Sequence, residues 1–67
     1  MKNKAHPIMI AAVKAVRPCE RIAAARCAEV TFIKALRKLQ QFADYSEQDN
    51  IEMAAQAAAA EVAFKFA

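Results

Sequence analysis

The sequence predicts an all-α protein: a short helix followed by a long antiparallel helical hairpin, in one domain that forms a dimeric helical bundle. The chain of 67 residues contains no glycine, so the usual left-handed helix cap is missing, and the alternation of apolar and polar residues that is typical of a strand is absent from its central segment. Apolar residues recur at helical spacing through the middle of the chain, and the last third is rich in alanine, the strongest helix former. A chain this short buries a small core, so a disulfide, a metal or a partner is expected to add stability.

Residues 8–17 form the predicted short helix, after a start at 1–6 that we expect to be frayed. Pro7 suits the first helical turn, because the N–H that it lacks is not needed there. Pro18 should end the helix, since its ring clashes with the carbonyl four residues back; the pattern leaves open a kink or a full break. We expect this helix to fold across one end of the hairpin. Its apolar stripe is Met9, Ala12, Val13 and Val16.

Residues 18–43 form the predicted long helix, with an apolar arc over about half of its circumference. Glu29 interrupts this arc. We expect Glu29 to lie near the edge and to reach water or Arg26, because a buried lone carboxylate is costly. The alternative is a buried basic partner that fixes how the helices pair. The arc consists of Ile22, Ala25, Ala28, Phe32, Ile33, Leu36, Leu39 and Ala43.

The polar run from Asp44 to Asn50 predicts a turn near residues 44–47, because a continuous helix would direct polar side chains into the apolar arc. Ser46 is the expected N-cap of the next helix, with Asp44 as the competing choice. Either N-cap places acidic residues in the first helical turn, where the helix dipole favours them.

Residues 47–65 form the predicted third helix, which is apolar on two opposite sides. A helix of this kind is normally buried on both sides, and three helices in 67 residues cannot wrap it. We therefore expect the second side to bind another protein, most simply a second copy in a twofold homodimer. The first stripe is Ile51, Ala55, Ala58 and Val62, and the second, the predicted partner-binding stripe, is Met53, Ala57, Ala60 and Phe64.

Charge is divided unevenly along the chain. Up to Ala43 there are nine Lys and Arg against two Glu (+7), and from Asp44 onward one Lys against five acids (−4). Helices of opposite charge attract when they fold antiparallel, so the first interpretation is complementation within the chain. The cluster Lys34, Arg37 and Lys38 is either a solvated face or a contact site for nucleic acid or an acidic partner.

Catalytic and metal-binding motifs are missing from the sequence. Without glycine there is no phosphate-binding loop or dinucleotide fingerprint, and Ser, His and Asp do not form a catalytic set. Cys19 and Cys27 would lie about 12 Å apart along one helix, too far for a disulfide, and their spacing does not suggest zinc. We therefore expect neither enzymatic activity nor a cofactor, and two isolated thiols favour the cytoplasm.

The predicted function is a small adaptor, co-chaperone or inhibitor that docks a protein partner. Nucleic-acid binding through the basic face of the long helix is the alternative, with a strong dependence on salt. No segment is long enough to span a membrane. A peripheral membrane helix, built on residues 8–17 or on the C-terminal residues 64–66, is a third interpretation, which the absence of Trp and the scarcity of Leu disfavour.

Overall fold

The computed structural model describes residues 6–42 and 44–67. These residues form α1 (Pro7–Lys14), a short 3-10 helix η1 (Pro18–Glu20), α2 (Arg21–Phe42) and α3 (Glu47–Lys65), with no strand among them. The prediction of an all-α fold is therefore confirmed. Of the residues 1–6 predicted to be frayed, 1–5 lie outside the described residues, as does Ala43 of the apolar arc. At His6 the prediction is wrong, because His6 is the N-cap of α1 and its Nδ1 accepts a hydrogen bond from the backbone N–H of Ile8 (3.2 Å).

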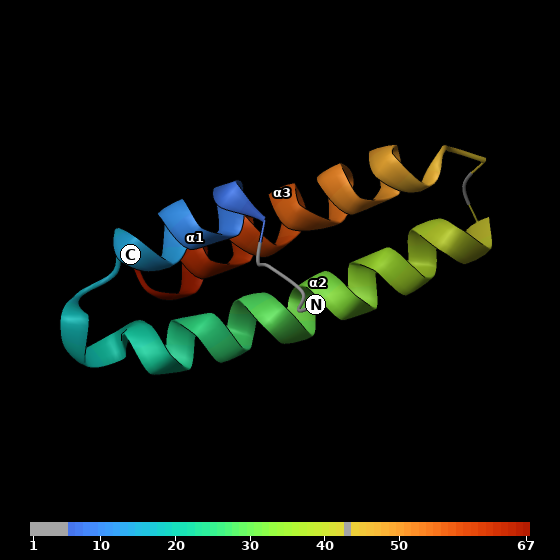
Figure 1. Cartoon of the computed structure of the whole chain (residues 1–67). Coiled ribbons are helices and arrows are strands. Elements are labelled where there is room, and N and C mark those ends of the chain that lie inside the picture. Colours follow the sequence, from blue (N-terminus) through green and yellow to red (C-terminus); the bar gives the residue numbers. More distant parts are fainter. Residues whose placement is uncertain (1–5, 43) are drawn as a thin grey trace, which may run out of the picture.

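The three helices pack side by side (Figure 1). α2 and α3 run in opposite directions and make the most extensive contact, and α1 lies along the C-terminal half of α3 and runs in the same direction. The prediction that the first helix crosses one end of the other two is therefore wrong. Met9 in α1 and Val16 just after its end are both buried in the core that α1 shares with the other two helices.

The first helix ends earlier than the sequence suggested. It was predicted to run to Arg17, but α1 stops at Lys14. Arg17 has an extended backbone (φ −56°, ψ 144°), because the residue before a proline is pushed out of the helical region. Pro18 then begins η1, so the proline produces a full break in the helix and not a kink.

A single side chain bridges this break. Arg21 Nη2 donates to the carbonyl oxygen of Lys14 (3.0 Å), and Arg21 Nε donates to that of Val16 (3.3 Å). The last carbonyls of a helix have no partner within the helix, so the guanidinium of Arg21 satisfies groups that the break leaves free. Arg21 is also the first residue of α2, and it therefore ties the end of α1 to the start of α2.

The buried side of α2 is rotated away from the centre of the predicted arc. Ala24 and Ala28 are buried, whereas Ala25 is exposed and Ile22 is 76% exposed. α3 presents a row of alanines to the interior, and small residues on α2 let the two backbones approach closely, which larger side chains would prevent. Glu29 is exposed, so the alternative of a buried basic partner for it is wrong.

α3 begins with a side-chain cap. Ser46 has an extended backbone, and its hydroxyl accepts a hydrogen bond from the backbone N–H of Asp49 (3.2 Å). This bond satisfies one of the free N–H groups of the first turn, so Ser46 and not Asp44 is the N-cap. Glu47 and Asp49 lie in the first turn, where the positive end of the helix dipole favours acidic groups.

The core consists mostly of small residues, and the largest side chain that is completely buried is Val62. Phe32, Cys27 and Phe66 pack against this core but stay partly exposed. Asn50 is the buried polar residue, and its Oδ1 has no hydrogen-bond partner in the described part of the chain. The buried apolar residues are Met9, Val16, Ala24, Ala28, Ala54, Ala55, Ala58 and Val62.

None of the helices formed by residues 6–42 and 44–67 combines the length and the apolar character that crossing a membrane requires.

Candidate interaction surfaces

The third helix has one buried and one exposed apolar side. The inner stripe is Ile51, Ala55, Ala58 and Val62, of which the last three are fully buried and Ile51 is half-buried. The outer stripe, predicted as the partner-binding side, is Met53, Ala57, Ala60 and Phe64, and all four residues are exposed.

Helical geometry explains the difference between the two stripes. Successive residues turn by about 100°, so the outer stripe lies opposite Val62, on the side turned away from α1 and α2. Met53 is 40% exposed and Phe64 is 82% exposed. The two largest side chains of α3 on this side therefore remain open to solvent, with two alanines between them.

Other large apolar side chains are also outside the core. On α2 they include Ile33, which is 42% exposed, and Phe42 at the end of the helix. Isolated exposed apolar residues are normal, but here eight large ones are exposed, whereas five of the eight buried apolar residues are alanine. The exposed set is Ile10, Ile22, Val30, Ile33, Phe42, Tyr45, Met53 and Phe64.

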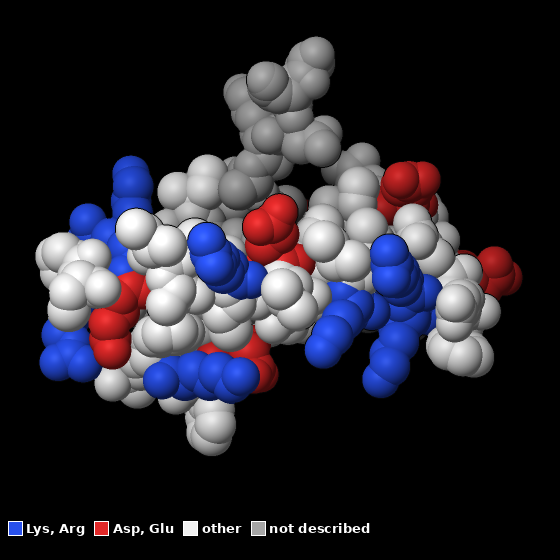
Figure 2. Space-filling view, turned by 90° about the horizontal axis from the view of Figure 1, so that it is seen from below, with Lys and Arg blue, Asp and Glu red and all other residues white. Residues whose placement is uncertain are grey.

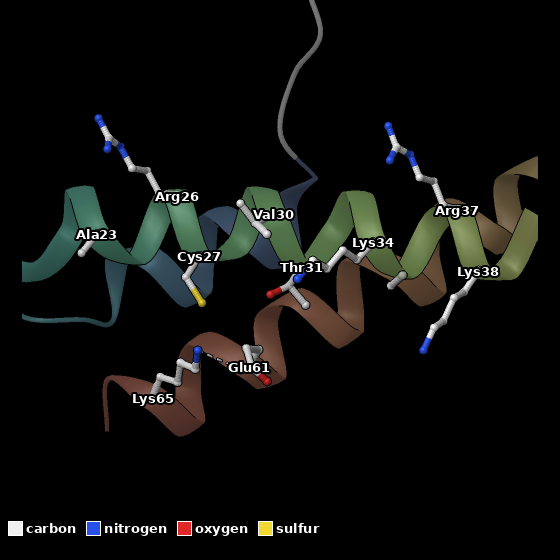
Figure 3. A pocket seen from close by; sticks show the side chains of 11 residues that line it. Ala23, Arg26, Cys27, Val30, Thr31, Lys34, Arg37, Lys38, Glu61 and Lys65 are labelled. Atoms are coloured by element: carbon white, nitrogen blue, oxygen red, sulfur yellow. Dashed lines mark ion pairs between the residues drawn. The ribbon is translucent and has the colours of Figure 1, made fainter.

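The predicted basic cluster borders an open groove between α2 and the C-terminal half of α3 (Figure 3). Lys34, Arg37 and Lys38 are exposed and line this groove. Figure 2, which looks onto the α2 side of the molecule, shows Lys and Arg side chains distributed along the length of this face. The other residues of the groove are Ala23, Arg26, Cys27, Val30, Thr31, Ala35, Glu61 and Lys65.

The basic side chains around the groove point in two directions. In Figure 3, Cys27, Thr31 and Lys38 point toward the α3 side of α2, and Lys34 extends over Thr31. Arg26 and Arg37 extend from the other edge of α2, away from α3. The groove therefore has an inner set of positive charges next to α3 and an outer set on its far rim.

α3 contributes one wall of the groove. Lys65 Nζ lies 3.4 Å from Glu61 Oε2, an exposed pair one turn apart that contributes little stability. Lys65 and Glu61 were not among the predicted site residues. They are distant in sequence from the basic cluster. The sequence could have indicated them, because Glu61 directly follows Ala60 and Lys65 directly follows Phe64.

Within residues 6–42 and 44–67, no ion pair joins a basic residue of the first half of the chain to an acidic residue of the second half. Among the described residues, the ion pairs are Arg17 with Glu20 (3.2 Å) and Lys65 with Glu61, each within one segment. The predicted attraction between the basic and acidic halves is therefore not expressed as direct ion pairs among these residues. Arg26 and Arg37 extend away from α3 (Figure 3).

The described residues offer little for chemistry. They contain no group of three His, Cys, Asp or Glu side chains that could hold a metal ion. Cys19 is exposed and Cys27 is half-buried against the core, and both are free thiols. What the geometry provides is an exposed apolar stripe next to a basic groove, a combination that suits contact with another macromolecule.

No family model, curated protein or solved structure matches this chain. The function must therefore be inferred from the two surfaces themselves.

Proposed function

We propose that this protein is a cytoplasmic, non-enzymatic interaction module of the adaptor, co-chaperone or inhibitor type that self-associates through the outer stripe of α3. In this proposal α2 and α3 act as a helical hairpin, and two hairpins form a dimeric bundle. The observation that carries it is the distribution of side-chain sizes: five of the eight buried apolar residues are alanine, whereas residues as large as Phe64 and Ile22 are exposed.

Burying the outer stripe against a partner would stabilise the protein. Full burial of a Phe or Met side chain contributes about 1.5–3 kcal/mol. Most of this stabilisation is missing at Phe64, which is 82% exposed, and a smaller part is missing at Met53, which is 40% exposed. A core dominated by alanine gains far less per residue, because an alanine side chain is a single methyl group. Association is therefore the route by which this chain can bury its largest apolar groups.

The spacing of the outer stripe fits a second copy of the same helix. Met53, Ala57, Ala60 and Phe64 follow the alternating intervals of four and three residues that form a coiled-coil seam. In an antiparallel pair that places Ala57 opposite Ala60, Met53 falls opposite Phe64, and sulfur–aromatic contacts are favourable. The central alanines let the two helices approach closely. A twofold axis relates the two copies, so both contribute the same residues to the contact.

The test is the mass of the purified chain in solution. Light scattering should give a dimer for the natural sequence and a monomer for each of two single variants, Met53→Lys and Phe64→Glu. Circular dichroism should show that each variant retains its helix. Ile22→Glu is the matched control for Phe64→Glu. It introduces the same negative charge at an apolar residue of α2 that is 76% exposed, compared with 82% for Phe64. A natural chain that is a monomer at all accessible concentrations contradicts the proposal.

A further inference from the structure

We propose that the groove between α2 and α3 binds a single-stranded nucleic acid. The strand would run along α2, with its phosphates between the inner and outer sets of basic side chains and one base stacked on Phe42. This function is additional to self-association and does not depend on it, because none of the basic residues of the groove belongs to the outer stripe of α3.

The groove carries an excess of positive charge. Five basic residues line it together with one acid, Glu61, whose Oε2 lies 3.4 Å from Nζ of Lys65. The other four basic residues belong to α2, and none of them takes part in the ion pairs found among residues 6–42 and 44–67. These four are all exposed and are Arg26, Lys34, Arg37 and Lys38.

These charges do not stabilise the helix that carries them. Lys38 follows Lys34 by one helical turn, and like charges at this spacing repel each other. A polyanion that lies over the surface relieves this repulsion, because its phosphates neutralise several cations at once and release condensed counterions. The groove is therefore suited to a polymer with regularly repeated negative charges.

The length of the basic surface corresponds to a short strand. Arg26 and Lys38 are twelve residues apart, which is about 18 Å along the axis of α2. A stacked strand advances by about 3.4 Å per nucleotide, so about five nucleotides lie beside this part of the helix. Because Arg26 and Arg37 extend from one edge of α2 and Lys38 from the other, a backbone running along the helix meets positive charge on both of its sides (Figure 3).

The apolar residues of the groove favour a single strand over a duplex. Ala23, Val30 and Ala35 also line the groove, and Val30 is 52% exposed. A single strand has unpaired bases whose faces can cover such side chains. A duplex keeps the faces of its bases stacked inside and would leave the apolar part of the groove in contact with water.

An exposed aromatic ring continues the basic surface at one end. Phe42, the last residue of α2, follows Lys38 by one turn on the same side of the helix and is 82% exposed. Exposed rings next to a basic groove are the surfaces on which single-stranded nucleic acids stack their bases. Asp44 and Glu47, which come next in the chain, are exposed and would repel phosphates beyond Lys38. An uncharged base can still reach Phe42, so we expect the contact to end there by stacking.

The test is the salt dependence of binding to a fluorescently labelled thymidine 20-mer, measured by anisotropy between about 50 and 200 mM salt. Each phosphate contact of a single strand contributes about −0.7 to the slope of log K against log salt concentration, so four contacts give about −2.8. The affinity of the natural chain should therefore fall about 50-fold over this range.

Two double variants, each of which removes two charges, examine the two sets separately. Lys34→Gln with Lys38→Gln, and Arg26→Gln with Arg37→Gln, should each reduce the slope to about −1.4. The matched control is Lys14→Gln with Arg17→Gln, which lowers the net charge by the same amount at exposed residues that do not line the groove. The control should keep the slope of the natural chain.

The ring of Phe42 gives a readout that does not depend on charge. Phe42→Ala should weaken binding by at least about fivefold and leave the salt slope unchanged, because stacking releases no counterions. Phe42→Tyr, which keeps an aromatic ring, should bind like the natural chain. Circular dichroism should show the same helix content in all of these variants, since every replaced side chain is exposed.

Absence of binding at 50 mM salt overturns the inference, and so do double variants that keep the slope of the control. Equal affinity for a 20-base-pair duplex, with Phe42→Ala binding like the natural chain, shows that bases are not contacted and also overturns it. The same holds if polyglutamate displaces the oligonucleotide at equal charge concentration, because the groove is then a contact site for acidic proteins. Light scattering separates this inference from the proposed self-association: a monomer that binds the 20-mer contradicts only the latter, and a dimer that does not bind it contradicts only the former.

Discussion

The two apolar sides of α3 belong to the same helix and have almost the same length, yet they have opposite environments. The inner stripe, from Ile51 to Val62, lies against α1 and α2, and the outer stripe, from Met53 to Phe64, faces solvent. Both contain two alanines in the middle. The difference is at the ends, where the outer stripe has the larger side chain, Phe64 against Val62.

This comparison shows that side-chain size does not decide which side of α3 is buried. The interior is filled by pairs of small residues, such as Ala24 and Ala28 on α2 with Ala55 and Ala58 on α3, which allow a close approach of backbones. Close approach gains many dispersion contacts per residue, and larger groups would hold the helices apart. The larger groups therefore remain outside, where a partner can use them.

The largest expected effect comes from a charge on the inner stripe. Val62→Asp places an unpaired carboxylate at a residue that is 0% exposed, at a cost of more than about 3 kcal/mol. A chain of 67 residues has a total stability of only about 3–10 kcal/mol, so the variant should be largely unfolded by circular dichroism. Ala63→Asp, at the exposed neighbour, should keep its helix content; similar losses in both variants would remove the contrast between the two sides.

An intermediate effect is expected from added volume. Ala58→Leu overfills the contact between α2 and α3 and should lower the free energy of unfolding by about 1–3 kcal/mol in urea titrations. Ala57→Leu, one residue earlier on the exposed side, should change the stability of the monomer by less than about 0.5 kcal/mol. Equal losses for the two would show that the outer stripe is packed as tightly as the inner one.

The smallest effect, and one of opposite sign, is expected at Asn50. Its Oδ1 is buried without a hydrogen-bond partner among the described residues, a situation that costs about 1–3 kcal/mol. Asn50→Leu replaces the amide by an apolar group of the same branching and should raise stability by about 1 kcal/mol. For a domain of this size the melting temperature would rise by about 4–8 °C. Asn50→Asp should lower the melting temperature, and a decrease with Leu as well would mean that the amide is satisfied in solution.

Much of the helical structure is visible in the sequence because its signals are local. The cap at Ser46 depends on residues within one turn, and the two stripes of α3 follow from helical periodicity. The end of α1 and the rotation of α2 were mispredicted, because both depend on tertiary contacts. A pattern that ranks residues by hydrophobicity selects Ile22 and Ala25 for the interior, whereas close helix packing selects Ala24 and Ala28.

The candidate site divides in the same way. The exposure of Met53 and Phe64 can be predicted from α3 alone, because this helix has two apolar sides and the short chain cannot cover both. The basic cluster of α2 can be predicted because its residues are close together in the sequence. The groove is a property of two helices, and its second wall at Glu61 and Lys65 could be located only when the alignment of α2 with α3 was known. The lack of ion pairs between α2 and α3 in the described part of the chain likewise depends on which way each side chain points.

The bridge made by Arg21 joins the first helix to the start of α2. One guanidinium donates to two carbonyls on the far side of a proline, so the corner between the helices is closed by hydrogen bonds. A chain without glycine has few other means of turning sharply, and here the donor that closes the corner is a cation. The same contact keeps the carbonyls at the end of α1 hydrogen-bonded where the chain leaves the helix.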